Sequence, residues 1–350
     1  MAKPALAEST IRHAVLVERL KAGEARKFEA FLREIDRNLR EQLTRGELTT
    51  YKRRRLEALL AEIDAMLAEV LGRFTGQLDM QLREFAEYEA GAAMRALDNA
   101  GIAYALPAAE QLWAAVKVEP LQAGKGKLLA AFIRDWTQAE REAVTGAIRL
   151  GVAQGQTTAE IVKAIRGTAA LKYADGLLAV TKRNAEAVVL TSVAHVGAVA
   201  RSEAYAANAD IFAGWEFSAT LDTRTSSTCR SLSGRVFKLG QGPLPPVHVR
   251  CRSVAIPVLS DEYSWLAKGE KQASIDGPVD GSLTYYGWLK RQSRETVMDV
   301  LGPSRGKLFL DGGLSAGRFA ALQLDRRFEP VTLEELKMLD AAAWRRAGLK

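Results

Sequence analysis

Two cysteines and one histidine in the second half of the sequence are the residues best suited to chemistry. Cys229 and Cys251 are the only cysteines of the chain, and His248, one of three histidines, lies between them. Thiolate and imidazole groups are good ligands for Zn²⁺, and the His-x-x-Cys spacing of His248 and Cys251 lets both reach one ion. The trio therefore indicates a candidate zinc site.

Other interpretations of this trio stay open. A closed structural zinc site needs four ligands, and the chain offers three soft donors, with Asp222 and the poor ligand Ser226 as neighbours. The two cysteines could instead form a disulfide if the protein ends in an extracellular particle. All three side chains could also pack in a core, with the histidine bonded to a backbone carbonyl. A cysteine nucleophile with a histidine base is the enzymatic alternative.

A short polar motif precedes this trio. Asp222, Arg224 and Thr225 follow a segment in which Trp215 and Phe217 alternate with smaller or polar residues, as in a strand. An aspartate after a strand can accept hydrogen bonds from the next backbone amides, and an arginine can cross-brace the loop. We expect the motif to lock a tight turn rather than to act in catalysis.

Positive charge is concentrated around these motifs. The whole chain has 49 basic and 42 acidic residues, a net charge of +7, whereas residues 212–260 hold six basic residues against Glu216 and Asp222. Clustered arginine and lysine suit contact with DNA phosphates or with an acidic protein surface. The candidate DNA-facing residues are Arg230, Arg235, Lys238 and Arg250.

The composition is that of an ordinary globular protein. The 350 residues are 48% hydrophobic and 26% charged, enough for about two domains without disulfide bonds. Two cysteines favour a reducing compartment, and the start of the chain contains no apolar segment typical of a secretory signal. Mean hydropathy is −0.09 and no long apolar run occurs, so we expect no membrane contact.

Long helices must position these motifs. Apolar residues recur at three- and four-residue steps from Leu16 to Leu43 and again from Leu56 to Phe85, which predicts two amphipathic helices that pack as an intramolecular bundle. Residues 99–127 are rich in glycine and proline and are expected to form a connection. Further helices are predicted over residues 128–148 and 175–208, with a capping box at Thr157 and Glu160 between them.

The expected fold is mainly α with a small α+β module. Residues 1–145 form a helical N-terminal region, residues 146–260 form helices followed by the small β module, and residues 261–350 form a mixed C-terminal region. In that last region we expect a short helix around residues 295–301 and a terminal helix over residues 332–346. Thr332 and Glu335 give the terminal helix a second capping box.

The order of motifs in the central region resembles the Mu F-like head-morphogenesis, or minor head protein, family of tailed phages. The resemblance covers roughly residues 145–340 and includes Gly234, Pro246 and Arg252 as structural positions. Ser226 and Ser253 stand where some members have additional cysteines. The motifs are Asp-Thr-Arg-Thr at 222–225, Cys229, Leu-x-Gly-x-x-Phe at 232–237, Pro-Pro-Val-His at 245–248 and Cys-Arg-Ser at 251–253.

This resemblance implies a structural role in the virion. Such a protein associates with the portal protein at the capsid vertex and acts in procapsid assembly or DNA packaging, without enzymatic turnover. The implied partners are the portal protein, the major capsid or scaffolding protein and the packaged DNA. The implied location is the phage head, and the host cytoplasm during assembly. This role requires no cofactor. Zn²⁺ is the candidate metal for the Cys/His trio.

Two other function classes are kept as alternatives. An enzyme could use the Cys/His trio as a hydrolase, or could be an ADP-ribosyltransferase, which usually needs a Glu-x-Glu pair near a late strand. Glu334 and Glu335 are adjacent and lie in a predicted helix, which counts against the transferase. A nucleic-acid-binding module is the third class, with Trp215 and Phe217 expected in the core rather than stacked on bases.

Overall fold

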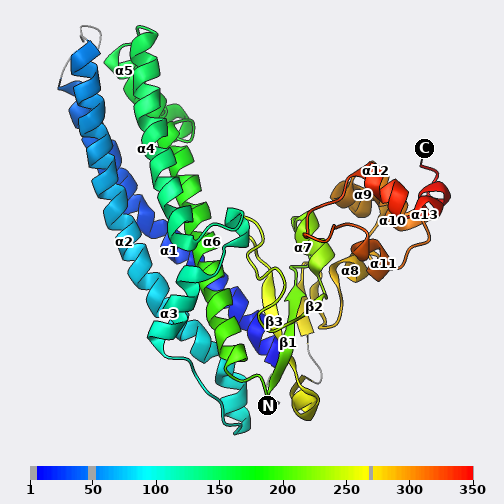
Figure 1. Cartoon of the computed structure of the whole chain (residues 1–350). Coiled ribbons are helices and arrows are strands. Elements are labelled where there is room, and N and C mark those ends of the chain that lie inside the picture. The colour runs from blue at the N-terminus through cyan, green and yellow to red at the C-terminus, as the bar shows by residue number, and fades with distance from the viewer. Residues whose placement is uncertain (1–5, 46–52, 268–270, 350) are drawn as a thin grey trace.

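The computed structural model describes residues 6–45, 53–267 and 271–349. It is 66% helical, with a small antiparallel sheet of three strands, so the predicted fold class is confirmed. Figure 1 shows two arms that diverge from a small β module: a long helical bundle and a shorter lobe at the C-terminal end of the chain. None of the described helices is long and apolar enough to cross a membrane.

The bundle forms because each long helix carries an apolar face that needs a partner. Phe28 is fully buried, and its ring lies 4.9 Å from that of Phe74 and 5.8 Å from that of Trp136, which joins three helices in one core. The predicted intramolecular bundle is therefore present. Its helices are α1 (Leu6–Thr44), α2 (Arg53–Ala100), α3 (Ala109–Val118), α4 (Leu129–Ala153), α5 (Thr158–Arg166) and α6 (Leu177–Ala206).

The bundle crosses the expected boundary between the first two regions. Residues 145 and 146 both lie inside α4, which continues to Ala153. One hydrophobic core extends from α1 to the start of β1, and α6 packs against α1, α2 and α4. The helices of residues 146–206 thus share their core with those of residues 1–145.

The glycines and prolines of residues 99–127 predicted a connection, but this segment is not irregular throughout. It contains α3, in which Leu112 and Val116 are buried against the bundle at 2% and 0% exposure. An apolar pair at i and i+4 was enough to form a short helix between the turns at Gly101 and at residues 122–126.

The capping box at Thr157 begins α5 as predicted. The Oγ1 atom of Thr157 accepts a hydrogen bond from the amide of Glu160, and a carboxylate oxygen of Glu160 accepts one from the amide of Thr157 at 2.7 Å. Gly167 ends the helix with a φ of 92°, a value that glycine adopts without strain.

The β module consists of a three-stranded antiparallel sheet and one short helix. The strand order is β2-β1-β3, and Trp215 of β1 is opposite Phe237 on one side and Pro257 on the other. Trp215 and Phe217 are 2% and 0% exposed, so both are core residues, as predicted. The elements are β1 (Phe212–Ser218), α7 (Ser227–Leu232), β2 (Val236–Lys238) and β3 (Val254–Leu259).

A separate cluster of aromatic and aliphatic side chains forms the core of the C-terminal lobe. Tyr286, Phe309 and Phe319 are buried with ring centroids 4.8 to 5.6 Å apart. After a 3-10 helix at Asp261–Ala267, the lobe contains β4 (Lys271–Ser274), β5 (Gly277–Asp280), α8 (Tyr285–Leu289), α9 (Arg294–Leu301), α10 (Pro303–Asp311), α11 (Ala316–Ala321), α12 (Leu333–Leu339) and α13 (Ala341–Arg346).

The predicted terminal helix is divided in two. Its capping box is present, but α12 ends at Leu339 because Asp340 leaves the helical conformation, with φ −150° and ψ 72°. The Asp340 carboxylate then accepts a hydrogen bond from the amide of Ala343 at 3.0 Å and caps α13. An aspartate inside an apolar pattern thus starts a new helix.

Candidate functional site

Cys229, His248 and Cys251 converge in the β module. The Sγ atom of Cys229 lies 3.2 Å from Nε2 of His248 and 3.6 Å from Sγ of Cys251. The three ligand atoms all lie within 4.8 Å of one another, and no further His, Cys, Asp or Glu of the described chain joins them. Both cysteines are buried free thiols. The fold thus brings together all three residues that the sequence singled out.

Local hydrogen bonds position the trio. The hydroxyl of Ser226 caps α7 by accepting a hydrogen bond from the amide of Cys229 at 3.3 Å. His248 and Cys251 belong to the loop between β2 and β3, where the amide of Cys251 donates to the carbonyl of His248 at 3.1 Å. Nδ1 of His248 faces the carbonyl of Val249 at 2.9 Å, which leaves Nε2 directed at the cysteines.

The bundle holds this loop from the other side. The carbonyl of Pro246, a residue of the predicted motif, accepts a hydrogen bond from the amide of Ala123 at 3.0 Å. The amide of Arg250 donates to Oγ1 of Thr191, a fully buried residue of α6, at 3.1 Å. The loop that carries His248 and Cys251 is therefore fixed between the helical bundle and the sheet.

The three side chains shift one another's protonation. The hydrogen bond with Cys229 lowers the pKa of Cys251, and His248 lowers it further, whereas the same contact raises the pKa of Cys229. The hydrogen bond with Cys251 also raises the pKa of His248. These shifts make Cys251, rather than Cys229, the thiol that loses its proton more readily.

The two separations from the Cys229 sulfur fit a zinc ion. Tetrahedral zinc with Zn–S bonds of about 2.3 Å and Zn–N bonds of about 2.0 Å would hold two sulfurs about 3.8 Å apart, and a sulfur and a nitrogen about 3.5 Å apart. The observed 3.6 Å and 3.2 Å lie close to those values. Three donors leave one of the four tetrahedral positions without a His, Cys, Asp or Glu from the described chain.

Asp222 organises the turn after β1. Its Oδ1 atom accepts hydrogen bonds from the amide of Arg224 and the hydroxyl of Thr225, both at 3.0 Å. Arg252 then donates to both carboxylate oxygens, at 2.6 Å and 3.0 Å. Burial alone would raise the pKa of Asp222, but its hydrogen bonds and Arg252 hold that pKa below its usual value. The carboxylate is thus ionised and fully engaged, as expected of a structural brace.

The arginine that braces this turn is not the neighbouring one. The Arg224 guanidinium approaches Asp222 only to 3.9 Å, and its side chain is 81% exposed. Arg252, the residue after Cys251, forms the two-point contact instead. It therefore couples the turn directly to the Cys/His trio.

Gly234 marks a close approach between the β module and the C-terminal lobe. It has a φ of 81°, and a Cβ atom at this position would lie 2.5 Å from Cγ2 of Thr284. The neighbouring hydroxyl of Ser233 accepts a hydrogen bond from the amide of Tyr285 at 2.9 Å. A glycine is therefore required by both conformation and space.

Two of the four candidate DNA-facing residues connect the module to the lobe instead. Arg230 donates to the carbonyls of Thr225 and Val300, each at 2.6 Å, and lies over the ring of Tyr285. Arg235 is half-buried and reaches the carbonyl of Ala320 at 3.4 Å.

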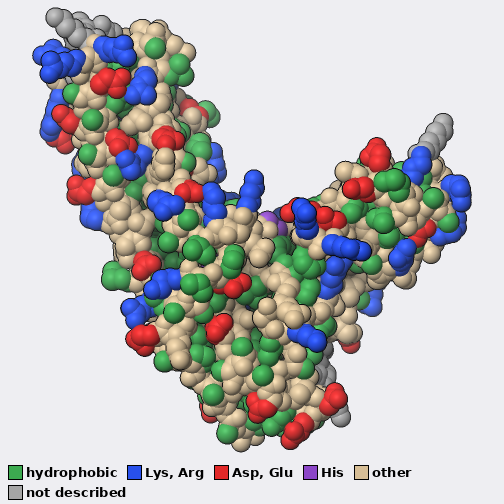
Figure 2. All heavy atoms as spheres, in the orientation of Figure 1, with side chains coloured by type: hydrophobic (Ala, Val, Ile, Leu, Met, Phe, Trp, Pro, Cys, Tyr) green, Lys and Arg blue, Asp and Glu red, His purple; other side chains and the backbone are tan. Residues whose placement is uncertain are grey.

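The other two candidates are exposed. Lys238 projects from β2, and Arg250 donates to the carbonyl of Arg183 at 2.7 Å and lies 3.7 Å from Glu186. Figure 2 shows basic and acidic side chains mixed over both arms, with no continuous basic surface on the face shown among the coloured residues. Of the four candidates, Lys238 and Arg250 are thus exposed, whereas the guanidinium groups of Arg230 and Arg235 are bonded to backbone carbonyls.

Sequence reasoning missed a buried ionic cluster in the bundle. Glu89 of α2 is fully buried and binds the guanidinium of Arg201 of α6. Its other oxygen lies 2.5 Å from Nε2 of His13 on α1. These residues are 76 and 112 positions from Glu89, so no local pattern links them. A glutamate in the apolar register of α2 was the available signal.

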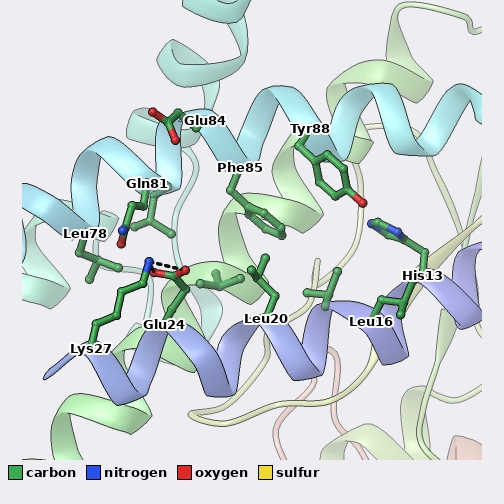
Figure 3. Close-up of a pocket in the computed structure, with 13 residues that line it drawn as sticks. His13, Leu16, Leu20, Glu24, Lys27, Leu78, Gln81, Glu84, Phe85 and Tyr88 are labelled. Atoms are coloured by element: carbon green, nitrogen blue, oxygen red, sulfur yellow. Dashed lines mark hydrogen bonds and ion pairs between the residues drawn. The ribbon is translucent and has the colours of Figure 1, made fainter. Parts of the chain in front are cut away.

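This cluster lies at one end of a groove between α1 and α2. Figure 3 shows His13 beside Tyr88 at that end and the Glu24–Lys27 ion pair at the other, with Leu16 and Leu20 between them. The groove has a volume of about 440 Å³. Leu16 and Leu20, predicted to be buried in the helix stripe, are 58% and 40% exposed and line this groove.

Two other helix residues hold the bundle together. His195 is 2% exposed, and burial lowers its pKa to about 4, so it is a neutral core residue. Asn208, near the end of α6, accepts a hydrogen bond from the amide of Ala105 at 2.7 Å and donates to the carbonyl of the same residue at 2.8 Å. It thereby fixes the segment between α2 and α3.

Comparison with known proteins bears on the same region. Residues 142–256, about a third of the chain, match the family model described as Phage Mu protein F like protein. The match begins inside α4 and ends in β3, so it includes the Asp222 turn and the Cys/His trio. No curated protein and no solved structure matches the chain. The predicted resemblance is confirmed over these residues, and the part expected from residue 257 to 340 lies outside the match.

Proposed function

We propose that this chain, whose residues 142–256 match the model of the Phage Mu protein F like family, is a minor head protein that associates with the portal protein at the capsid vertex. The family is one of phage head morphogenesis, and that role is the basis of the proposal. At the vertex the protein acts without turnover, in procapsid assembly or in DNA packaging. Major capsid or scaffolding protein and packaged DNA are its further proposed partners.

The single observation that carries the proposal is the family match, which includes β1, α7, β2 and the first half of β3. The bonding of the β module supports a structural role. Both carboxylate oxygens of Asp222 already accept hydrogen bonds, from Arg252, Thr225 and a backbone amide. Neither oxygen is therefore placed to exchange a proton with a substrate. Glu335 is occupied in the cap of α12, which disfavours a transferase.

The burial of the cysteines supports the same conclusion. Cys229 and Cys251 are 1% and 3% exposed. A nucleophilic cysteine must reach its substrate, and reactive cysteines are partly accessible. A buried pair beside a histidine is better suited to holding the module together.

We propose Zn²⁺ as the cofactor of this trio. Cys229, His248 and Cys251 would hold the ion, which when bound would cross-link α7 to the loop before β3. Ser226 and Arg252 would orient the ligands from outside, through the cap of α7 and the brace to Asp222.

The test is quantitative mass spectrometry of purified, tail-free heads from the source phage or prophage. We expect the chain at low copy number together with the portal protein. Its absence from heads combined with abundance in the lysate would remove the virion component from consideration. A transient assembly factor or an enzyme would then be the better interpretation.

A further inference from the structure

The surface of the C-terminal lobe has a groove that no other part of the described chain covers. The groove has a volume of about 650 Å³ and lies between the turn at residues 325–329 and helix α12. Leu322 and Val331 form a buried floor, at 4% and 7% exposure. Met338 and Leu339 stand at its edge with 76% and 52% of their surface exposed, which is costly for side chains of this type unless something covers them.

Three arginines line the same groove. Arg318 is exposed and lies 3.6 Å from the carboxylate of Asp340, Arg326 is exposed, and Arg235 of the β module is half-buried. The guanidinium of Arg235 reaches a carbonyl oxygen at 3.4 Å, and burial lowers the pKa of Arg235. An arginine that is partly desolvated without a carboxylate is suited to receive one from a partner.

The acidic residues of the groove are already engaged by the backbone. Asp325 accepts hydrogen bonds from the amides of Arg327 and Glu329, at 2.8 Å and 2.9 Å. Glu335 accepts one from the amide of Thr332 at 2.6 Å. These carboxylates stay charged but are turned to the backbone of the turn and of the helix cap, so against the three arginines the groove keeps a small excess of positive charge beside its apolar side chains.

The wall of the groove is fixed in place. Phe328 has a φ of 63°, a left-handed conformation that is rare for a bulky residue, within the turn that Asp325 closes. Its ring packs edge-on against that of Phe237 of β2, with the two ring centroids 6.0 Å apart. A preformed surface of this kind loses little conformational entropy on binding.

We propose that this groove binds an acidic amphipathic segment of another virion protein. Apolar side chains of that segment would cover Leu322, Phe328 and Met338, and its Asp or Glu side chains would pair with Arg235 and Arg326. The inference rests on the proposed function, because it places the partner in the phage head. A nucleic acid would use the arginines but would leave the apolar edge exposed, and is therefore the less suitable occupant.

Site-specific photocross-linking in assembling heads tests this inference. The photoreactive residue is introduced as Met338→p-benzoylphenylalanine, and the control is Met80→p-benzoylphenylalanine, because Met80 on α2 is similarly exposed at 63%. We expect position 338, and not position 80, to cross-link to one segment of another head protein. That segment, identified by mass spectrometry of the cross-linked peptide, should combine apolar with acidic residues.

A matched pair of charge reversals tests the arginines. Arg326 lines the groove, whereas Arg327, its exposed neighbour in the same turn, does not. In the Met338→p-benzoylphenylalanine background, Arg326→Glu should lower the cross-link yield about tenfold, since it replaces an ion pair by a repulsion, and Arg327→Glu should lower it about twofold or less. Thermal melting of both variants verifies that they fold.

Each other outcome overturns the inference. Cross-links from position 338 to DNA, to a second copy of this chain or to a segment without acidic residues would identify a different occupant. Equal yields at positions 338 and 80, or equal effects of the two charge reversals, would show that the groove is not the binding surface. Absence of the chain from heads would overturn the proposed function as well, whereas its presence without a specific cross-link would overturn the groove alone.

Discussion

Arg252 holds the carboxylate of Asp222 in a two-point contact, with Nη1 donating to Oδ2 at 2.6 Å and Nη2 donating to Oδ1 at 3.0 Å. The pair joins the turn after β1 to the residue that follows Cys251. A guanidinium matches both oxygens of a carboxylate in one plane, so the contact fixes orientation as well as distance. One ion pair thus connects the two motifs that the sequence presents separately.

Removal of this carboxylate should destabilise the β module. Asp222→Ala leaves Arg252 and two turn donors without their acceptor, and should lower the free energy of unfolding by about 2–4 kcal/mol. Arg224→Ala is the matched control, because that guanidinium is 81% exposed and should change stability by about 0.5 kcal/mol or less. Urea unfolding of both variants measures the difference. Equal losses would mean that Arg252 is not the brace.

The buried Glu89 cluster should give the bundle a distinct acid sensitivity. Burial alone would raise the pKa of Glu89, but Arg201 and His13 outweigh it and hold that pKa below its usual value. The stabilisation is therefore complete above the unfolded pKa of about 4.3 and is lost as the pH falls below it, toward the folded value. Glu89→Gln, which leaves Arg201 buried without a counter-charge, should cost about 3–5 kcal/mol at neutral pH.

The measurement is urea unfolding of wild type and Glu89→Gln across the acid range. The difference between the two proteins should shrink as the pH falls below about 4. Glu84→Gln, an exposed glutamate on the same helix, should follow the wild type throughout. A difference between wild type and Glu89→Gln that stayed constant into acid would contradict an ionised Glu89 in the folded protein.

Local patterns predicted the parts of the fold that depend on neighbouring residues. The capping boxes at Thr157 and Thr332 and the Cys/His trio were visible because their members lie within a few residues or are rare in the composition. Periodicity also located the long helices. It could not reveal that Leu16 and Leu20 stay exposed beside a groove, because that depends on how α1 and α2 pack in space.

Contacts between distant residues could not be predicted. Asp222 and Arg252 are 30 positions apart, and Glu89 and Arg201 are 112 positions apart, so neither pair leaves a spacing signal. Positive charge in the sequence was a poor guide to the exposed basic surface for the same reason. Arg230 belongs to a basic segment of the sequence, yet its guanidinium donates hydrogen bonds to the carbonyls of Thr225 and Val300.

Three states of the Cys/His trio can be told apart by experiment: bound zinc, a disulfide, and free thiols packed in the core. If zinc is bound, the purified protein should contain the metal in stoichiometric amount by atomic emission, and a chelator should lower its melting temperature. Cys229→Ser or His248→Gln should abolish the metal. Ser226→Ala, which removes a cap but no soft ligand, should retain it.

Thiol titration of the denatured, chelated protein separates the remaining cases. Two reactive thiols with metal present support zinc, and two reactive thiols without metal support simple packing. Absence of reactive thiols would instead show that Cys229 and Cys251, whose sulfurs lie 3.6 Å apart, had been oxidised to a disulfide. Either of the last two results would contradict the zinc proposal.

Gly234 allows conformational strain and steric overlap to be measured separately. Gly234→Ala should lower the free energy of unfolding by about 2–4 kcal/mol, because its φ is 81° and its Cβ would lie 2.5 Å from Cγ2 of Thr284. Gly240→Ala, at a φ of 70° with open space around it, should show the conformational cost alone, about 1 kcal/mol.

Addition of Thr284→Ser should partly rescue Gly234→Ala. Serine removes the Cγ2 atom but keeps the hydroxyl that caps α8 through the amide of Gly287. The double variant should therefore recover the steric part of the loss and approach the stability of Gly240→Ala, as measured by urea unfolding of all three. No recovery would mean that the left-handed backbone of Gly234, and not its contact with the C-terminal lobe, is what excludes a side chain there.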